Sequence, residues 1–316
     1  ERHGQGVYSE EGINYNGNWE RNKYDGHGTL ELGNGSKYVG QFINGKKVGK
    51  GVITGPVFSY DGEWKASKFD GYGILECMKE QQREDHDGSY KRYEGEFKEM
   101  DFHGHGILLF VNGNKYDGEF KDDKMDGRGV FSFANGSKYE GQFKASKYSG
   151  EGIYTYINGD QYNGQWKDNL REGNGTLTKN PNLYKESVGQ LKQGYVLEMF
   201  WKDVFYKKYT GQWQADKRHG TGTQFYTDGD EYIGNFVNDV AEGYGEYKWA
   251  NGDYYKGQFK NAHPHGSGSV VLDIRKYGAT VACSQPNTAV KYKCDTIDGC
   301  TLGDFNINFG NKLHIY

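Results

Sequence analysis

Aromatic and polar residues alternate with a period of two along most of this chain. In the stretch 115–121, Tyr116, Gly118 and Phe120 fall on one side of an extended backbone, and charged residues fall on the other. Such alternation predicts a β-strand with one packed face and one face in water. No apolar period of 3.6 residues is visible, and each of the 49 glycines would cost about 1 kcal/mol inside a helix. The pattern therefore predicts an all-β chain.

The alternating block returns as a repeat of 23 residues. Each copy reads Tyr-x-Gly-x-Phe/Trp and is followed by a Gly-x-Gly pair that begins eleven residues after the tyrosine. Ten copies open at Tyr15, Tyr38, Tyr60, Tyr93, Tyr116, Tyr139, Tyr162, Tyr209, Tyr232 and Tyr255. The chain begins inside a further copy, since Gly4 and Gly6 form a second half without a first, so we expect about eleven copies and a longer native protein. A fixed period of this size is typical of a repeat array, which offers surface rather than chemistry.

Each copy predicts a β-hairpin whose two strands are joined by a polar loop, residues 123–126 in the copy at Tyr116. A tighter turn is expected between copies, because Asn-Gly or Asp-Gly stands there and both residues of such a pair tolerate positive φ. These pairs are 34–35, 112–113, 135–136, 158–159, 228–229 and 251–252. The glycine between the two aromatics leaves room for a ring from a neighbouring strand. Successive hairpins would then join into one single-layer antiparallel sheet, in which each hairpin adds roughly 10 Å.

Composition supports a thin sheet without a thick aliphatic core. Hydrophobic residues make up only 34% of the chain, yet aromatic residues reach 16%, with 27 Tyr and 17 Phe. Aromatic rings stacked over glycine would supply the packing that a single sheet needs. The 4 prolines are few enough for a continuous hydrogen-bonded ladder.

Three stretches depart from the repeat and set the expected organisation. The array is predicted over residues 1–268, with a charged insert near 78–91 and a degenerate copy near 187–208 that keeps Gly189 but has lost both aromatics. The degenerate copy is expected to bend the ribbon or to make a contact of its own. Residues 269–316 are predicted to be a C-terminal capping or interaction segment. Within it, 270–274 and 304–309 have the pattern of strands.

Tyr-x-Gly-x-Phe/Trp followed by Gly-x-Gly at this spacing resembles the MORN repeat, over roughly residues 1–268. The resemblance implies an elongated, twisted, single-layer antiparallel ribbon of tandem β-hairpins. It also implies a scaffold in protein complexes, at membranes or at the cytoskeleton. Members of the family include radial spoke head proteins of cilia and flagella, and junctophilins. In some members the repeats stand beside a catalytic domain.

Candidate chemistry is sparse. The net charge of −4 excludes a polycation that coats nucleic acid, and Lys202, Lys207 and Lys208 are interpreted as a solvated patch. The four cysteines are too few and too unevenly spaced for a disulfide framework, and we expect no metal site and no cofactor. Most histidines precede a repeat glycine, namely His3, His27, His103, His105, His219 and His265, so they mark a repeat position rather than a ligand cluster. A catalytic pocket needs enclosure and a single-layer ribbon encloses little, so no enzymatic activity is predicted.

The function predicted from these observations is binding of other proteins along the aromatic face, whose rings are expected to pack and to stay partly exposed. The candidate partner-binding residues are Tyr116, Phe120, Tyr139, Phe143, Tyr162, Trp166, Tyr209, Trp213, Tyr232 and Phe236. The family resemblance favours a structural scaffold in the axoneme of a cilium or flagellum, with other radial spoke head subunits as partners. A homodimer, a membrane-tethering or phospholipid-binding adaptor, and the targeting region of a larger enzyme are the alternatives.

Overall fold

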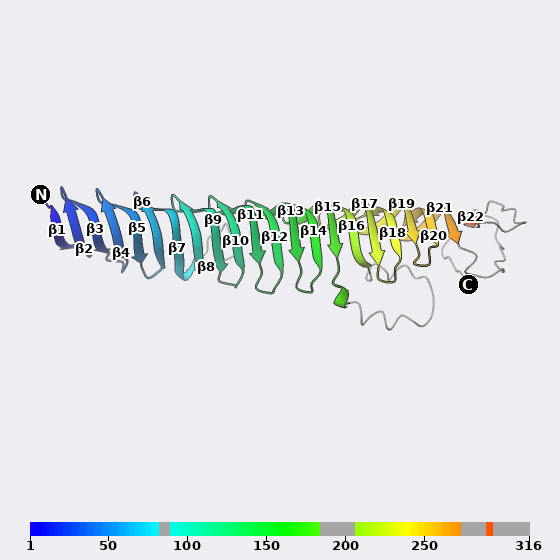
Figure 1. Ribbon diagram of the computed structural model, residues 1–316, viewed down its shortest axis with the longest axis horizontal. Coiled ribbons are helices and arrows are strands. Elements are labelled where there is room, and N and C mark those ends of the chain that lie inside the picture. Colours follow the sequence, from blue (N-terminus) through cyan, green and yellow to red (C-terminus); the bar gives the residue numbers. More distant parts are fainter. Residues whose placement is uncertain (82–88, 184–205, 273–288, 293–316) are drawn as a thin grey trace, which may run out of the picture. The chain divides into compact units, whose positions relative to one another are not determined.

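The computed structural model describes residues 1–81, 89–183, 206–272 and 289–292. These residues form β-strands and one turn of 3-10 helix, η1 (Pro181–Leu183), and no α-helix occurs among them (Figure 1). The strands are β1 (Gly4–Glu10), β2 (Ile13–Glu20), β3 (Lys23–Glu31), β4 (Lys37–Ile43), β5 (Lys46–Thr54), β6 (Phe58–Lys65), β7 (Lys68–Gln81), β8 (Tyr90–Lys98), β9 (Asp101–Phe110), β10 (Lys115–Lys121), β11 (Lys124–Ser132), β12 (Lys138–Lys144), β13 (Lys147–Thr155), β14 (Gln161–Lys167), β15 (Leu170–Thr178), β16 (Tyr206–Gln214), β17 (Lys217–Tyr226), β18 (Glu231–Val237), β19 (Val240–Lys248), β20 (Tyr254–Lys260), β21 (His263–Leu272) and β22 (Ala289–Tyr292).

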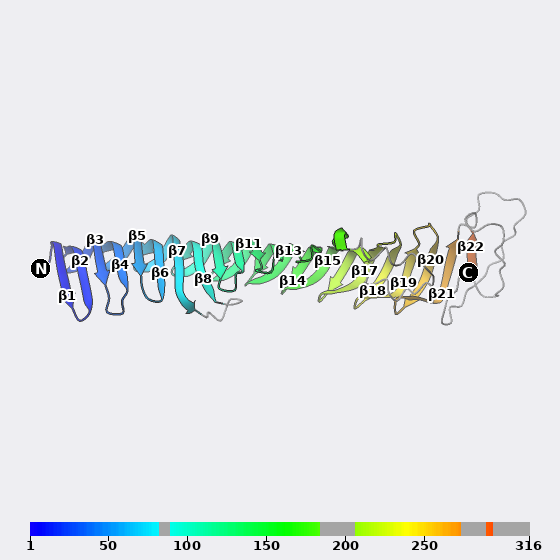
Figure 2. The same ribbon diagram turned by 90° about the horizontal axis from the view of Figure 1, so that it is seen from below.

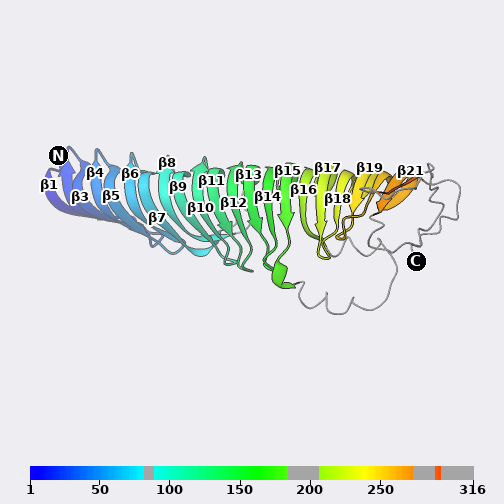
Figure 3. The same cartoon turned by 45° about the vertical axis from the view of Figure 1, so that its right-hand side comes forward.

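The chain divides into two compact units, residues 1–152 and 153–316, with the boundary inside β13. In the first unit, β1 to β12 follow one another in sequence order, each antiparallel to the next (Figure 2). In the second unit, β14 to β21 do the same (Figure 3). β22 adds to β21 in parallel (Figure 2). Each unit is a single-layer, open sheet that grows by one hairpin per repeat, so the predicted fold class is confirmed. The division of the chain at residue 268 stays a prediction.

The prediction of which connections are tight and which are long is wrong. The tight turn lies within each repeat, and the longer loop lies between repeats. Within a repeat, β10 and β11 are joined by a turn of only two residues, Asp122 (φ 49°) and Asp123 (φ 65°), as in a type I′ turn. Between repeats, five residues, 133–137, join β11 to β12. There Gly136 alone takes a positive φ, 92°, while the Asn135 side chain accepts a hydrogen bond from the N–H of Ser137 at 2.9 Å. The Asn-Gly pair therefore builds an Asx turn inside a wider loop, since asparagine can bond its own backbone as well as adopt positive φ.

The charged insert and the degenerate copy do not interrupt the pairing of strands on either side of them. β7 has 14 residues, more than any other described strand, and it still pairs with β8 at Gln81 and Tyr90, so part of the predicted insert extends this hairpin. Residues 82–88 lie outside the described part. β15 pairs directly with β16, with Gly175 opposite Gly211, as neighbouring repeats do elsewhere. Residues 184–205, which hold most of the degenerate copy, lie outside the described residues, so its bend or contact stays a prediction.

The C-terminal segment is described only in part. Residues 270–272, predicted to open a separate strand, are the end of β21, which began in the last repeat. β22 covers the outer edge of β21 in parallel register, from Ser269 opposite Ala289 to Leu272 opposite Tyr292. The strand predicted at 304–309 lies outside the described residues.

Candidate functional site

The tyrosine that opens each repeat, here called the ring tyrosine, lies flat over two glycines. Its hydroxyl donates a hydrogen bond to the backbone carbonyl three residues further on, at 2.8–3.2 Å in all ten copies. For Tyr116 the two glycines are Gly118 on its own strand and Gly129, directly opposite on the next strand. A Cβ on Gly129 would come within 3.0 Å of the Tyr116 hydroxyl, closer than real Cβ atoms approach. The ring thus comes from the same strand as the first glycine, and not from a neighbouring strand as predicted.

The Phe or Trp four residues after each ring tyrosine builds a ladder of perpendicular rings. Tyr116 meets Phe120 of its own repeat edge to face at 5.0 Å and Phe143 of the next repeat at 4.9 Å. Tyr162 meets Trp213 in the same way at 5.3 Å, although 51 positions separate them in the numbering. Edge-to-face pairs at this distance stabilise the fold beyond the burial of their area. The ladder explains how a sheet without a second layer is held together.

These contacts bury the ten residues that were predicted to bind a partner. Their side chains are between 0% and 7% exposed: Tyr116, Phe120, Tyr139, Phe143, Tyr162, Trp166, Tyr209, Trp213, Tyr232 and Phe236. The expectation that these rings stay partly exposed is therefore wrong. Their role in binding a partner stays a prediction, and their structural role is to hold neighbouring hairpins together.

The ninth residue after each ring tyrosine, here called the covering residue, contacts the face of the ring in seven of the ten copies. In the first unit the covering residues are Tyr24, Lys47, Phe69, Phe102, Met125 and Tyr148, and in the second they are Arg171, Arg218, Ala241 and Pro264. Four aromatic covering residues stack on their tyrosines with centroids 3.7–3.8 Å apart. Lys47, Arg171 and Arg218 instead place a cation 4.9–5.9 Å from the ring centroid. The aromatic face therefore changes in chemistry from repeat to repeat at this position.

The outward face carries a second recurrent contact that was not predicted. The first glycine of the Gly-x-Gly pair has a positive φ, 68° at Gly173 and 62° at Gly220, and the ladder register shifts beside it. This bulge frees the next backbone N–H, and a side chain on the neighbouring strand accepts it. Gln165 accepts the N–H of Asn174 at 2.9 Å, and Gln212 accepts that of Thr221 at 2.9 Å. The two glycines of the pair thus have different tasks, because only the second makes room for the tyrosine ring.

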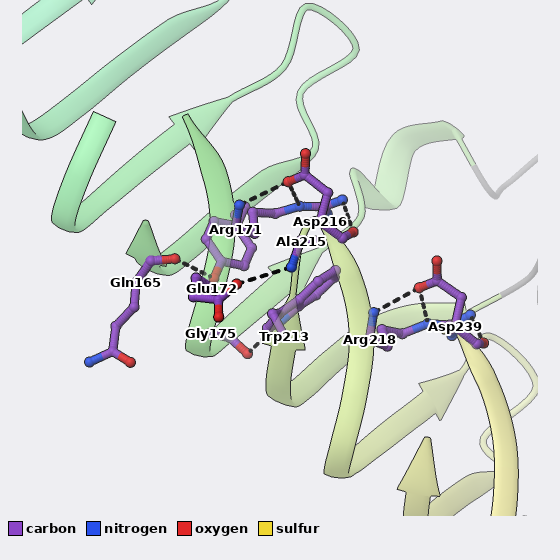
Figure 4. Close-up of polar contacts among 10 residues, drawn as sticks. Gln165, Arg171, Glu172, Gly175, Trp213, Ala215, Asp216, Arg218 and Asp239 are labelled. Carbon is purple, nitrogen blue, oxygen red and sulfur yellow. Dashed lines mark hydrogen bonds and ion pairs between the residues drawn. The ribbon is translucent and has the colours of Figure 1, made fainter. Parts of the chain in front are cut away.

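Two arginines give the second unit a cationic aromatic face (Figure 4). Arg171 lies 4.3 Å over the Trp213 ring and donates from Nε to the Asp216 carboxylate at 3.0 Å and from Nη2 to the Asp216 carbonyl at 2.6 Å. Arg218 makes the same two contacts to Asp239, at 3.2 and 2.6 Å. Each arginine thereby joins the aromatic face of one repeat to the tight turn of the next.

Burial controls the ionisation of the aromatic face. It raises the pKa of Tyr15, Tyr38, Tyr209 and Tyr255 to about 12, and it raises the pKa of Tyr60, Tyr93, Tyr116, Tyr139 and Tyr232 as well. Burial lowers the pKa of the Lys47 ammonium, which stands over Tyr38 and Trp64. The ring tyrosines are therefore neutral at physiological pH, as their packing requires.

Other kinds of site find little support in the part of the chain that the structure describes. No group of three or more His, Cys, Asp or Glu side chains is placed there to hold a metal ion. His103 and His105 lie on the outward face beside carboxylates, 3.9 Å from Asp122 and 3.5 Å from Asp117 respectively. Cys77 is the one cysteine within the described ranges. The same ranges contain no helix with the length and apolar character that a membrane span requires.

A family model described as MORN repeat matches eleven segments, which together make up more than half of the chain. They are residues 1–9, 15–37, 38–57, 60–79, 93–115, 116–138, 139–161, 162–182, 209–231, 232–254 and 255–271. The matches leave out residues 183–208, where the degenerate copy was predicted. The search of curated proteins returned no match.

Solved structures that are similar to this chain include three distant likenesses. The wild-type TCP10 domain of Danio rerio CPAP is similar at 10% identity, over 75% of this chain and 84% of that one, with a TM-score of 0.29. A mutant of the same domain gives the same identity and TM-score over 72% and 85% of the two chains. A streptogramin B lyase structure is similar at 11% identity over 83% and 86%, with a TM-score of 0.15. Likeness at this level carries no argument about fold or function.

Proposed function

Because this chain belongs to the MORN-repeat family, we propose that it is a non-enzymatic scaffold in a cytoskeletal assembly, the radial spoke head of the axoneme in a cilium or flagellum. The repeats themselves are consistent with a structural or interaction scaffold, and all-β arrays of this kind typically lack catalysis. The partners in this proposal are the other proteins of the spoke head. A homodimer is a second mode of assembly, which sedimentation of the purified chain would detect.

The observation that carries the proposal is that the ring tyrosines and the covering residues have different roles on the aromatic face. Ten ring tyrosines make the same hydroxyl contact in every repeat, whereas the covering residues range from tyrosine and phenylalanine to lysine, arginine, alanine and proline. The buried rings supply a rigid sheet. Four covering residues are buried as well, namely Phe69, Phe102, Met125 and Arg218. The six half-buried ones supply a surface of varied chemistry: Tyr24, Lys47 and Tyr148 in the first unit, and Arg171, Ala241 and Pro264 in the second. A rigid element with varied side chains on one face suits recognition of an elongated partner segment, such as a helix laid across several strands.

Substitution of covering residues tests this proposal without removing the ring ladder. Tyr24 and Tyr148 are half-buried, so both take part in packing and remain accessible. Replacement of both by arginine keeps the tyrosines beneath them covered, because Arg171 and Arg218 cover their tyrosines in the second unit. We expect Tyr24→Arg with Tyr148→Arg to lose spoke-head partners in affinity purification from ciliated cells. The matched control, Tyr24→Phe with Tyr148→Phe, should retain them.

A membrane-tethering or phospholipid-binding role is the alternative. Flotation with anionic liposomes at physiological salt separates the two proposals, because an axonemal scaffold stays with the soluble fraction and a lipid adaptor floats. If the chain is the targeting region of a larger enzyme, the complete reading frame would show a catalytic domain beside it. A hydrolase and transferase screen that found turnover abolished by a point substitution would overturn the non-enzymatic proposal.

A further inference from the structure

An asparagine, an aspartate and a lysine meet beside the end of β15 in the second unit. Asn158 and Asp160 belong to the loop before β14, and Lys179 is the first residue after β15. Nζ of Lys179 donates to Oδ2 of Asp160 at 2.9 Å, and Nδ2 of Asn158 donates to the same oxygen at 3.1 Å. One carboxylate oxygen thus holds an amine and a side-chain amide next to each other.

Lysine is exceptional at this position of the repeat. Lys179 is the seventeenth residue after its ring tyrosine, Tyr162. The other nine copies have no charged residue at the same place: Leu32, Gly55, Cys77, Phe110, Phe133, Tyr156, Tyr226, Trp249 and Leu272. Asn251 and Asp253 reproduce the other two members, with Nδ2 of Asn251 at 2.7 Å from Oδ2 of Asp253. Their copy has Leu272 where the lysine would stand, so it provides an internal comparison.

The carboxylate that joins the amine and the amide is buried. The side chain of Asp160 is 6% exposed, and that of Lys179 is 28% exposed. Nζ of Lys179 also lies 5.5 Å from the centroid of the Tyr206 ring. Burial works to raise the pKa of Asp160, but hydrogen bonds from Lys179, Asn180 and Asn158 outweigh it and hold that pKa below its usual value. Asp160 is therefore an ionised base at hydrogen-bond distance from the ammonium.

The Asn158 side chain is held as an electrophile. Its Oδ1 accepts the backbone N–H of Asp160 at 3.0 Å, so a donor stands where negative charge develops when the carbon Cγ is attacked. In an Asn-Gly pair the usual attacking group is the backbone nitrogen of the glycine. The N–H of Gly159 instead donates to the carbonyl of Tyr156 at 2.9 Å, which engages that nitrogen in the turn. The Lys179 amine is then the better placed nucleophile.

We propose that Lys179 and Asn158 form an intramolecular isopeptide bond, with Asp160 as the proton carrier. Asp160 takes a proton from the ammonium, and the neutral amine attacks Cγ of Asn158. The Cγ–Nδ2 bond then breaks, and Asp160 returns its proton to the departing nitrogen. The second proton of the attacking nitrogen leaves with the ammonia, as ammonium. One Nζ–Cγ amide is formed and one ammonium is released, with no oxidation and no co-reactant.

The bond would fasten the loop before β14 to the end of β15, directly before residues 184–205 in the sequence. This proposal goes beyond the scaffold role and does not depend on it, because the reaction needs three residues of the second unit and no partner.

The test is the intact mass of the purified whole chain during incubation at physiological pH, followed by tandem mass spectrometry of its tryptic peptides. The variants are Lys179→Arg, which keeps the charge and removes the nucleophile, and Asp160→Asn. Asparagine suits this position, because Asn114 holds it two repeats earlier and accepts the corresponding N–H of Ala134 at 3.0 Å. The matched control is Asn251→Ala in the loop that lacks the lysine. Circular dichroism checks that each variant keeps the β-signal.

The wild-type chain and the control should lose the mass of one ammonia and yield a branched peptide that links Asn158 to Lys179. Lys179→Arg should lose nothing, and Asp160→Asn should react about a hundredfold more slowly or less, since a positioned acid–base group contributes about 10²–10⁴-fold.

A wild-type chain of unchanged mass would overturn the proposal. Ammonia loss that persists in Lys179→Arg would also overturn it, because a succinimide at Asn158 has the same mass. Loss of one water in place of ammonia would show that Lys179 joins a carboxyl group instead. An unchanged rate in Asp160→Asn would contradict the role of that residue as proton carrier.

Discussion

Arg171 holds the turn of a strand that lies 45 residues further along the chain. Its Nε and its backbone N–H both donate to Oδ1 of Asp216, at 3.0 and 2.9 Å (Figure 4). The same arginine covers Trp213, whose indole N–H donates to the carbonyl of Gly175 at 3.2 Å. These contacts join β15 to β16 as neighbouring repeats are joined, although residues 184–205 intervene in the sequence.

Loss of the Asp216 carboxylate should therefore destabilise this junction. Asp216→Ala leaves Nε and the backbone N–H of Arg171 without their acceptor, while Nη2 keeps the carbonyl of residue 216. We expect a cost of about 1–2 kcal/mol after allowance for the partial exposure of Asp216. We expect faster amide exchange in β15 and β16 than in β18 and β19. Gln214→Ala, an exposed neighbour on the same strand, should leave exchange unchanged, and similar exchange in both variants would contradict the role of Asp216.

The second glycine of each Gly-x-Gly pair should tolerate no side chain. Gly129→Ala forces the Tyr116 ring away from its position over the strand, and we expect it to lower the free energy of unfolding by about 3 kcal/mol. Ser132→Ala on the same strand should change it by less than about 0.5 kcal/mol. Denaturant unfolding followed by circular dichroism measures both. A Gly129→Ala protein as stable as the wild type would show that the ring does not need this glycine.

Ionisation of the ring tyrosines should set the alkaline limit of stability. Their folded-state pKa values, about 12 at Tyr15, Tyr38, Tyr209 and Tyr255, lie above the value of about 10 expected in the unfolded chain. The stability from these groups is fully present below pH 10 and is lost as the pH rises from 10 towards 12, because only the unfolded chain releases the protons readily. The unfolding temperature should fall steeply over that range, and the ring tyrosines should ionise only as the β-signal disappears. Because exposed tyrosines such as Tyr72 and Tyr244 also contribute to the absorbance, the ring tyrosines are followed individually by NMR. Ionisation of ring tyrosines in a fully folded chain near pH 10 would contradict the burial of these rings.

Residues 184–205 should be dispensable for the folding of the second unit. Because Gly175 pairs with Gly211 in the ordinary repeat register, a short Gly-Ser linker in their place leaves every described contact between β15 and β16 intact. We expect the unfolding temperature to change by no more than about 2–4 °C, which corresponds to about 1 kcal/mol in a domain of this size. Failure of the shortened chain to fold would show that the degenerate copy is part of the array after all.

The strands could be predicted because inward and outward residues alternate in every copy and the same residue types return every 23 positions. Tyr-x-Gly-x-Phe/Trp fixes which side chains face inward, so the expected packing of Tyr116 and Phe120 on one face agrees with the structure. The covering residues could not be found this way, since Tyr24, Lys47 and Ala241 share a position and no chemistry. The turns were misassigned because Ala145 and Ser146 take positive φ values of 48° and 65° without any glycine to signal it. Pairing of the flanking strands imposes the positive φ at these two residues, and the local sequence contains no residue that predicts it.

The scaffold account is tested most directly by the position of the chain in a ciliated cell before and after detergent extraction. A tagged wild-type chain should remain with the extracted axoneme, and the chain with Tyr24→Arg and Tyr148→Arg should be lost from it while keeping the wild-type unfolding temperature. Release of the wild-type chain together with the membrane fraction would contradict the proposed role.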